Sequence, residues 1–254
     1  MKSTLITAVA LSGALALAGC GSSGSTSAPS SSGGSAASSS TTSNAPAATA
    51  GATLPAGDLG TRISDAMIVA RSGKGRMSSE GGSAKQALTG TLEFVFVDKK
   101  TTEMHGTMSS GGQNIEIITK SSVFYLKGVP AQMSGGKPWV KIDPNGTDPI
   151  SKSISQLGAN AGDPRAMVDA FKGGTAKVVD SSGGMTHYQI ADAKVSGATT
   201  SLIDVTVDAK DLPSNFTVAV QGTTVKVDYT DWGSAVTITE PPADQVGSVS
   251  MPTG

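Results

Sequence analysis

The chain has 254 residues, with 19 Lys and Arg against 20 Asp and Glu, and one cysteine. A net charge of -1 excludes nucleic-acid binding by bulk electrostatics, and a lone cysteine excludes an internal disulfide or a zinc site of four thiolates. Lys2 is the only charged residue before Asp58, so a nearly uncharged N-terminal part precedes a part of ordinary charge.

Residues 1–19 have the pattern of a cleaved secretory signal peptide. Lys2 supplies a positive start, and an apolar run follows from Leu5 to Leu17. A membrane-spanning helix needs about 20 apolar residues, so a run of about 13 is too short to cross a bilayer. We therefore expect export with removal of this segment.

The cysteine lies directly after small residues, in the sequence Leu17-Ala18-Gly19-Cys20. This resembles the lipobox of bacterial lipoproteins. The resemblance implies that Cys20 receives a diacylglyceryl group, becomes the new N-terminus and anchors the chain to the cell membrane. Two acyl chains, at about 0.8 kcal/mol per buried CH₂, form a stable anchor. A plain signal peptide followed by an incidental cysteine is the alternative interpretation.

Residues 20–57 are predicted to be the anchored cysteine followed by a disordered linker. From Gly21 to Gly57 every residue is Ser, Thr, Gly, Ala or Pro, except Asn44 and Leu54. This composition has almost nothing apolar to bury, so it favours disorder. A flexible linker of about 37 residues has a root-mean-square span of about 35 Å, which would let the folded part reorient above the membrane.

Residues 58–245 hold all the aromatic residues and are predicted to fold as one domain, followed by a flexible tail over 246–254. Helical spacing of apolar residues predicts a helix over 58–71 with Asp58 as its N-cap. Alternation with a period of two then predicts antiparallel strands, for instance around Phe94 and Val205. Turns are predicted at Gly111-Gly112, Ser182-Gly183-Gly184, Lys210-Asp211-Leu212-Pro213 and Gln221-Gly222.

Two short helices are predicted between two groups of strands. Asp148-Pro149 begins the first, which carries Leu157, and Asp163-Pro164 begins the second, which carries Met167 and Phe171. Their apolar stripes need an apolar surface, most simply the concave face of the sheet. The predicted fold class is thus α+β, a single strongly curved antiparallel sheet covered by an N-terminal helix and two central helices.

The order of these features resembles the actinobacterial LppX/LprAFG lipoproteins, which are related in shape to the LolA/LolB carriers. The resemblance rests on four sequence segments taken in order, together with the lipobox and the linker. They are Ser122–Lys127, Trp139–Ile142, the Asp163-Pro164 helix, and Val225–Gly233 with Val236–Ile238 and Pro241-Pro242.

The resemblance implies a half-barrel with an apolar cavity that binds or carries a lipid or lipoglycan on the extracytoplasmic face of the cell membrane. It implies no catalysis and no cofactor. A carrier needs a cavity lined by apolar side chains, because each CH₂ exposed to water costs about 0.8 kcal/mol. Ordinary core packing needs the same residue types at the same spacing. The candidate lining residues are Phe94, Phe96, Ile117, Leu157, Met167, Phe171, Ile203, Val205, Val207, Phe216 and Val218.

Enzymatic and metal-binding interpretations find little support. His105 and His187 are the only histidines, and neither belongs to a ligand motif, so we interpret them as surface residues. Asp143–Asp148 resembles the start of a calcium-binding loop, but its glycine is at the fourth position instead of the sixth. A turn is predicted there instead. Asp231-Trp232-Gly233 is interpreted as a strand-end turn with a packed indole.

A second function stays open beside the carrier. The same sheet could serve a surface-tethered interaction or sensor module without lipid cargo. An open apolar pocket of several hundred Å³ would distinguish a carrier from such a module. The sequence names neither a head group nor a partner transporter.

Overall fold

The computed structural model describes residues 49–81, 87–146, 151–152, 163–169, 171, 173–195, 198–199, 202–220 and 222–249. The helices in these ranges are α1 (Ala56–Ala70), α3 (Arg165–Asp169) and the 3-10 helix η2 (Ala243–Gln245). The strands are β1 (Thr53–Pro55), β2 (Ser72–Gly81), β3 (Leu88–Phe96), β4 (Thr102–Ser110), β5 (Gln113–Lys120), β6 (Val123–Lys127), β7 (Trp139–Ile142), β8 (Thr175–Ser182), β9 (Met185–Ala191), β10 (Lys194–Val195), β11 (Ala198–Thr199), β12 (Leu202–Asp208), β13 (Pro213–Val220), β14 (Thr223–Thr230) and β15 (Val246–Ser248).

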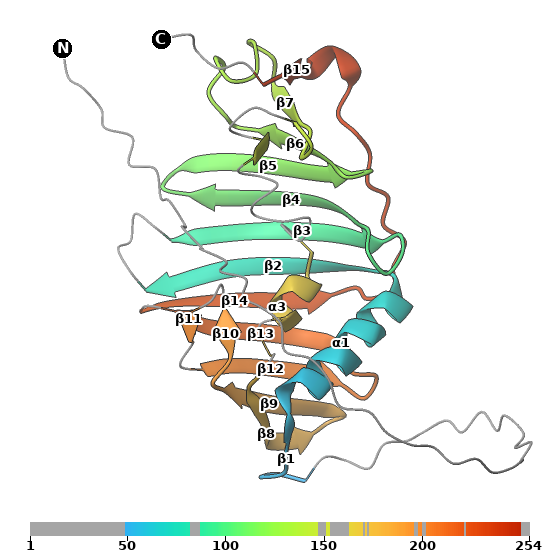
Figure 1. Ribbon diagram of the computed structural model, residues 1–254, viewed down its shortest axis with the longest axis vertical. Helices are drawn as coiled ribbons and strands as arrows, with labels where there is room; N and C mark the ends of the chain where they lie inside the picture. Colours follow the sequence, from blue (N-terminus) through green and yellow to red (C-terminus); the bar gives the residue numbers. More distant parts are fainter. Residues whose placement is uncertain are drawn as a thin grey trace, which may run out of the picture. The chain divides into compact units, whose positions relative to one another are not determined.

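Within the described residues, 13 strands form one open, curled sheet in the order β1-β8-β9-β12-β13-β14-β2-β3-β4-β5-β6-β7-β15 (Figure 1). Neighbours are antiparallel throughout, except that β15 runs parallel to β7. Strands β10 and β11 form a separate pair. The predicted antiparallel sheet is therefore confirmed, and its open form agrees with a half-barrel.

One face of the sheet, called the inner face below, carries α1. Leu59, Ile63 and Met67 of this helix are fully buried. Figure 1 shows α1 running obliquely across the sheet, from β8 towards β2. The strands present apolar side chains to it in register, as where Phe216 lies opposite Val205. Each such buried side chain contributes about 2 kcal/mol of hydrophobic stabilisation, which holds the helix on the sheet.

Strand β2 has glycines at inner-face positions where its neighbours have large side chains. Gly73 lies opposite Phe94. A Cβ atom on Gly73 would lie 2.7 Å from the Phe94 ring and 3.0 Å from Trp232. The glycine thus makes room for the aromatic rings of adjacent elements, and the inner face stays filled there without a side chain from β2.

The outer face of the sheet is partly covered by the segment 234–245 after β14, called the C-terminal strap below. Its Ile238 is 4% exposed and belongs to a buried cluster with Ile118, Tyr125 and Trp139. Lys120 Nζ donates a 2.8 Å hydrogen bond to the Ile238 carbonyl. The strap ends in η2, after which β15 pairs with β7, so the end of the described chain is built into the sheet edge.

The ends of the domain differ from the prediction. Helix α1 begins at Ala56 after Pro55, and Asp58 lies in its first turn instead of capping it. A carboxylate in the first turn still complements the helix dipole, which explains the misleading signal. The sheet extends from Thr53 to Ser248, so the predicted tail is corrected at Val246–Ser248, which forms β15.

The predicted central helices are partly confirmed. Helix α3 follows Asp163-Pro164 as expected. Of the first predicted helix, the structure describes only Ser151 and Lys152, which are helical, and Leu157 lies outside the described residues. The signal peptide and the lipobox with Cys20 also lie outside them. No helix among the described residues is long and apolar enough to cross a membrane.

Candidate functional site

The structure brings the described candidate lining residues together in one place. All of them except Leu157, which it does not describe, belong to the largest hydrophobic cluster or pack against it. Eight are buried there, whereas Ile117 and Met167 are only partly buried. The eight buried residues are Phe94, Phe96, Phe171, Ile203, Val205, Val207, Phe216 and Val218.

The half of the inner face built by β8, β9 and β12–β14 is a packed core. Ile203, Val205 and Phe216 have no exposed surface. The Phe216 ring lies 5.5 Å from that of Phe171, which follows the end of α3. Since these side chains contact one another, the core-packing alternative describes this half.

The half built by β3–β6 keeps aliphatic side chains partly open. In register across the four strands lie Leu92, Gly106, Ile117 and Leu126, and the three side chains are only partly buried. We call these four residues the aliphatic row. Leu92 and Leu126 were missing from the candidate lining, although the alternation that selected Ile117 places both on the same face. The glycine in the row leaves a shallow position between Leu92 and Ile117.

Aromatic rings from two strands, β3 and β14, and from the turn after β14 separate these halves. Phe94 lies 5.4 Å from Phe96, 6.2 Å from Tyr229 and 5.3 Å from Trp232, measured between ring centroids. The Trp232 indole donates a 2.8 Å hydrogen bond to the Pro213 carbonyl, so the strand-end turn with a packed indole is confirmed. Burial raises the pKa of Tyr229, which keeps this ring neutral.

A pocket of about 430 Å³ lies beside the main hydrophobic cluster. Its lining comes from α1, from the loop between β3 and β4, and from the start of α3. Most of these residues are polar, and none was among the candidate lining residues. They are Gly57, Gly60, Thr61, Ser64, Asp65, Lys99, Lys100, Asp163, Arg165, Ala166 and Val168.

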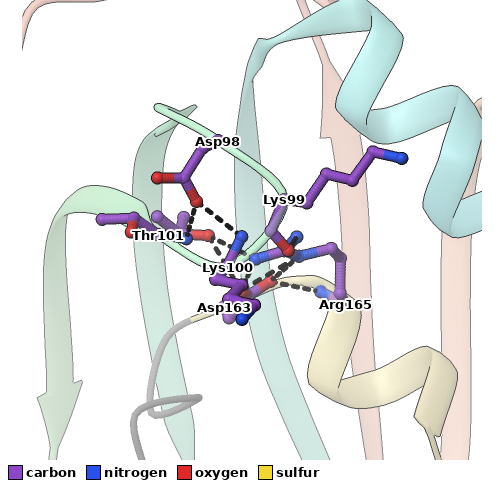
Figure 2. A network of polar contacts seen from close by, with 7 residues as sticks. Asp98, Lys99, Lys100, Thr101, Asp163 and Arg165 are labelled. Atoms are coloured by element: carbon purple, nitrogen blue, oxygen red, sulfur yellow. Dashed lines mark hydrogen bonds and ion pairs between the residues drawn. The ribbon is translucent and has the colours of Figure 1, made fainter.

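Asp98 shapes the β3–β4 loop at the edge of this pocket. One of its carboxylate oxygens accepts hydrogen bonds from the backbone amides of Lys100 at 2.6 Å and Thr101 at 2.7 Å. These two backbone bonds lower the pKa of Asp98 below its usual value. The turn therefore holds the adjacent lysines in one backbone arrangement (Figure 2).

Arg165 joins the loop to α3. Its Nε lies 2.9 and 3.0 Å from the Asp163 carboxylate oxygens, and its Nη1 donates a 2.6 Å bond to the Lys99 carbonyl. Thr102 donates a 2.8 Å bond to the same carboxylate. The guanidinium carbon also lies 4.9 Å from the centre of the Phe96 ring. Only 13% of the Arg165 side chain and 6% of that of Asp163 are exposed, so the pair is largely desolvated.

Sequence reasoning found Asp163 only as the start of a helix and missed its partner. The Asp98-Lys99-Lys100-Thr101 turn was visible as a polar interruption after the Phe94 strand. Nothing in the sequence placed that turn beside α3, because Thr102 and Asp163 are 61 residues apart.

The two histidines lie on strands, as expected, and both are partly exposed. His105 Nε2 lies 2.9 Å from Glu116, and His187 Nε2 lies 3.0 Å from Asp204. No group of three or more His, Cys, Asp or Glu side chains that could hold a metal ion occurs in the described part of the chain. The predicted calcium-like segment forms a turn as far as it is described, with Asn145 donating to Asp143.

The chain is similar in structure to several solved proteins. LprF from Mycobacterium bovis is 12% identical, and the match covers 73% of this chain and 96% of that protein with a TM-score of 0.43. The Mycobacterium tuberculosis lipoprotein LppX is 9% identical, with 72% and 98% covered and a TM-score of 0.43. A LolA superfamily protein from Nitrosomonas europaea is 8% identical, with 75% and 96% covered and a TM-score of 0.29.

No family model matches the chain, and no curated protein matches its sequence. These three neighbours belong to the groups of proteins that the sequence resembles, the LppX- and LprF-type lipoproteins and the LolA superfamily.

Proposed function

We propose that this protein binds a lipid or lipoglycan-type amphiphile against the inner face of its sheet and carries it without catalysing a reaction. The observation that carries the proposal is the aliphatic row on β3–β6. Leu92, Ile117 and Leu126 are aligned on one face and remain partly exposed, while the other half of that face is a closed core.

An aligned aliphatic surface suits an acyl chain better than a polar partner. A chain laid along the row would remove apolar area from water on both sides, at about 25 cal/mol per Å². The adjacent cluster of Phe94, Tyr229 and Trp232 would provide a rigid wall. Ile117 stays a proposed lining residue, and Leu92 and Leu126 join it.

The anchor belongs to the same proposal. Acylated Cys20 would hold the protein at the extracytoplasmic face of the cell membrane, and the linker after it would reach the sheet at β1. The Cys20→Ser variant should leave the membrane fraction and lack the mass of the diacylglyceryl group. An unchanged membrane fraction and an unchanged mature mass would contradict the anchor.

Native mass spectrometry tests the cargo. The full chain carrying Cys20→Ser, purified from its own host, should retain a lipid or take one up from vesicles. In the Ile117→Trp variant an indole would occupy the aliphatic row and reduce the loaded fraction several-fold. Val179→Trp is the matched control, because Val179 is 41% exposed and lies away from the inner face.

Empty protein in repeated preparations, with no uptake from vesicles, would overturn the carrier. The interaction or sensor module would then be the better account. The half of the inner face built by β8, β9 and β12–β14 is already filled by its own side chains and needs no cargo.

A further inference from the structure

We propose that the pocket between α1, the β3–β4 loop and α3 is an oxyanion site, which binds the phosphate or carboxylate head group of the carried amphiphile through Lys99 and Lys100. This inference rests on the proposed amphiphile binding and adds the chemical class of the head group. Nothing in the sequence pattern or in the structural comparisons assigns a ligand to this pocket.

The first argument is the balance of charge in the pocket. Lys99, Lys100, Arg165, Asp65 and Asp163 line it. Arg165 and Asp163 bind each other and are largely buried, so their charges offset one another. Neither lysine forms an ion pair or a side-chain hydrogen bond with any described residue. The Asp98 carboxylate at the edge of the pocket is bound by the backbone amides of Lys100 and Thr101 and does not line the pocket. Among the lining side chains, two ammonium groups against the one carboxylate of Asp65 leave an excess of positive charge, which suits a ligand of opposite charge.

The second argument is the fixed position of the lysines. Asp98 binds the backbone amide of Lys100, and Arg165 binds the carbonyl of Lys99. Figure 2 shows the Lys99 side chain extending from the loop towards α1, across the pocket that both elements line. A backbone held at both residues loses less entropy when the ammonium groups bind a ligand, which favours binding over an unstructured loop.

The third argument is the space and its position. The pocket of about 430 Å³ is large enough for a phosphate ester or a carboxylate. A Cβ atom on Gly57 would meet nothing within 4 Å, so this side of the pocket is open. Val168 lines the pocket and also belongs to the main hydrophobic cluster, so the polar space borders the apolar one. An amphiphile needs these two environments side by side.

The test measures binding to the full chain carrying Cys20→Ser by isothermal titration calorimetry. The probes are palmitate, palmitoyl lysophosphatidic acid, neutral monopalmitoylglycerol and inorganic phosphate. The Lys99→Gln/Lys100→Gln variant should bind both anionic amphiphiles about tenfold more weakly and the neutral one unchanged, because a charged hydrogen bond is lost. The Lys141→Gln/Lys177→Gln variant is the control, with the same charge change at exposed outer-face lysines.

Asp65→Asn should act in the opposite direction and tighten binding of the anionic probes, since it removes the carboxylate that opposes them. Added salt should weaken their binding and leave that of the neutral probe unchanged.

If both double variants lose the same affinity for the anionic probes, or if neither loses any, the oxyanion site is overturned while amphiphile binding remains. If no amphiphile binds but inorganic phosphate binds in a lysine-dependent manner, the site is an anion site and the head-group assignment fails together with the carrier function. If none of the probes binds, both proposals fail.

Discussion

Arg165 of α3 donates a 2.6 Å hydrogen bond to the backbone carbonyl of Lys99, and this bond connects the second half of the chain to the β3–β4 loop. The same guanidinium is held by Asp163. The loop is therefore held against the residues before and within a helix of five residues, which line the pocket together with it.

Replacing Asp163 should destabilise the protein strongly. The Asp163→Ala variant removes the buried carboxylate that binds the Arg165 guanidinium, which is 13% exposed, and the expected loss is about 3 kcal/mol of unfolding free energy. Urea unfolding followed by tryptophan fluorescence measures it. Thr102→Val removes the hydrogen bond to the same carboxylate and the 3.0 Å bond that the Thr102 hydroxyl accepts from Arg165, and it should lose only about 1–2 kcal/mol. Equal losses in the two variants would contradict the importance of the ion pair.

Two glycines of α1 should respond oppositely to the same substitution. A Cβ atom on Gly60 would lie 2.9 Å from Val168, whereas one on Gly57 would lie in open space. Gly57→Ala should raise the unfolding free energy by about 0.5–1 kcal/mol, because alanine favours the helix. Gly60→Ala should lower it by about 1–3 kcal/mol, because α3 is pushed away. Thermal unfolding of the pair, measured side by side, decides the matter, and a shift of the same sign in both would refute the close contact.

The outer face should show a pH-dependent contribution at Glu116. Burial raises the pKa of Glu116, but hydrogen bonds from Lys127 and His105 lower it more, so the net pKa lies below its usual 4.5. A lowered carboxyl pKa in the folded state stabilises the fold above that usual value, and the contribution disappears as the pH falls through the folded-state pKa.

Glu116→Gln should therefore lose up to about 1 kcal/mol at neutral pH, and this loss should shrink as the pH falls below 4.5. Urea unfolding at neutral pH and at a series of lower pH values measures the difference. Glu80→Gln, which changes an exposed carboxylate without an ion pair among the described residues, serves as control and should show no such dependence. A loss of unfolding free energy that is constant across the pH range would show that Glu116 contributes through packing and not through its charge.

The C-terminal strap should stabilise the outer face through Ile238. This side chain is 4% exposed, against Ile118, Tyr125 and Trp139. Ile238→Ala should lose about 2–4 kcal/mol of unfolding free energy and increase binding of a hydrophobic dye to the exposed cluster. Val236→Ala, at a partly buried position of the same strap, should lose less. Equal stability of Ile238→Ala and the unchanged chain would show that the strap contributes little.

Local periodicity was enough to predict the strands that carry large apolar side chains. Phe94, Val205 and Phe216 face inward, as their alternation indicates. Strand β2 escaped prediction because its inner positions include Gly73 and Gly75, which leave space for Phe94 and Leu92. A search for alternating apolar residues does not find a strand whose inner positions are glycines and whose neighbouring strand supplies the side chains that fill the space.

The site was less accessible to sequence reasoning than the fold. Candidate lining residues were chosen by apolar character, and most of them lie buried in the main hydrophobic cluster, because a core and a cavity lining demand the same side chains. The pocket depends on contacts such as that between Thr102 and Asp163, which no local pattern encodes. Strand β15 was missed for the same reason, since its three residues gain their form from pairing with β7.

Strand β1 determines how the folded domain responds to a force applied from its N-terminal side. Three residue pairs, Thr53–Pro55 against Thr175–Lys177, hold it to the edge of the sheet. A pull arriving from the N-terminal side would reach the bonds of Gly51 and Ala52 to Val178 first, and then the hydrogen bonds of this short strand. Such an edge yields at low force, whereas Leu59 and Ile63 behind it are buried and resist. Strand β1 would thus detach from the sheet under load and lengthen the chain on its N-terminal side, while the core stays intact.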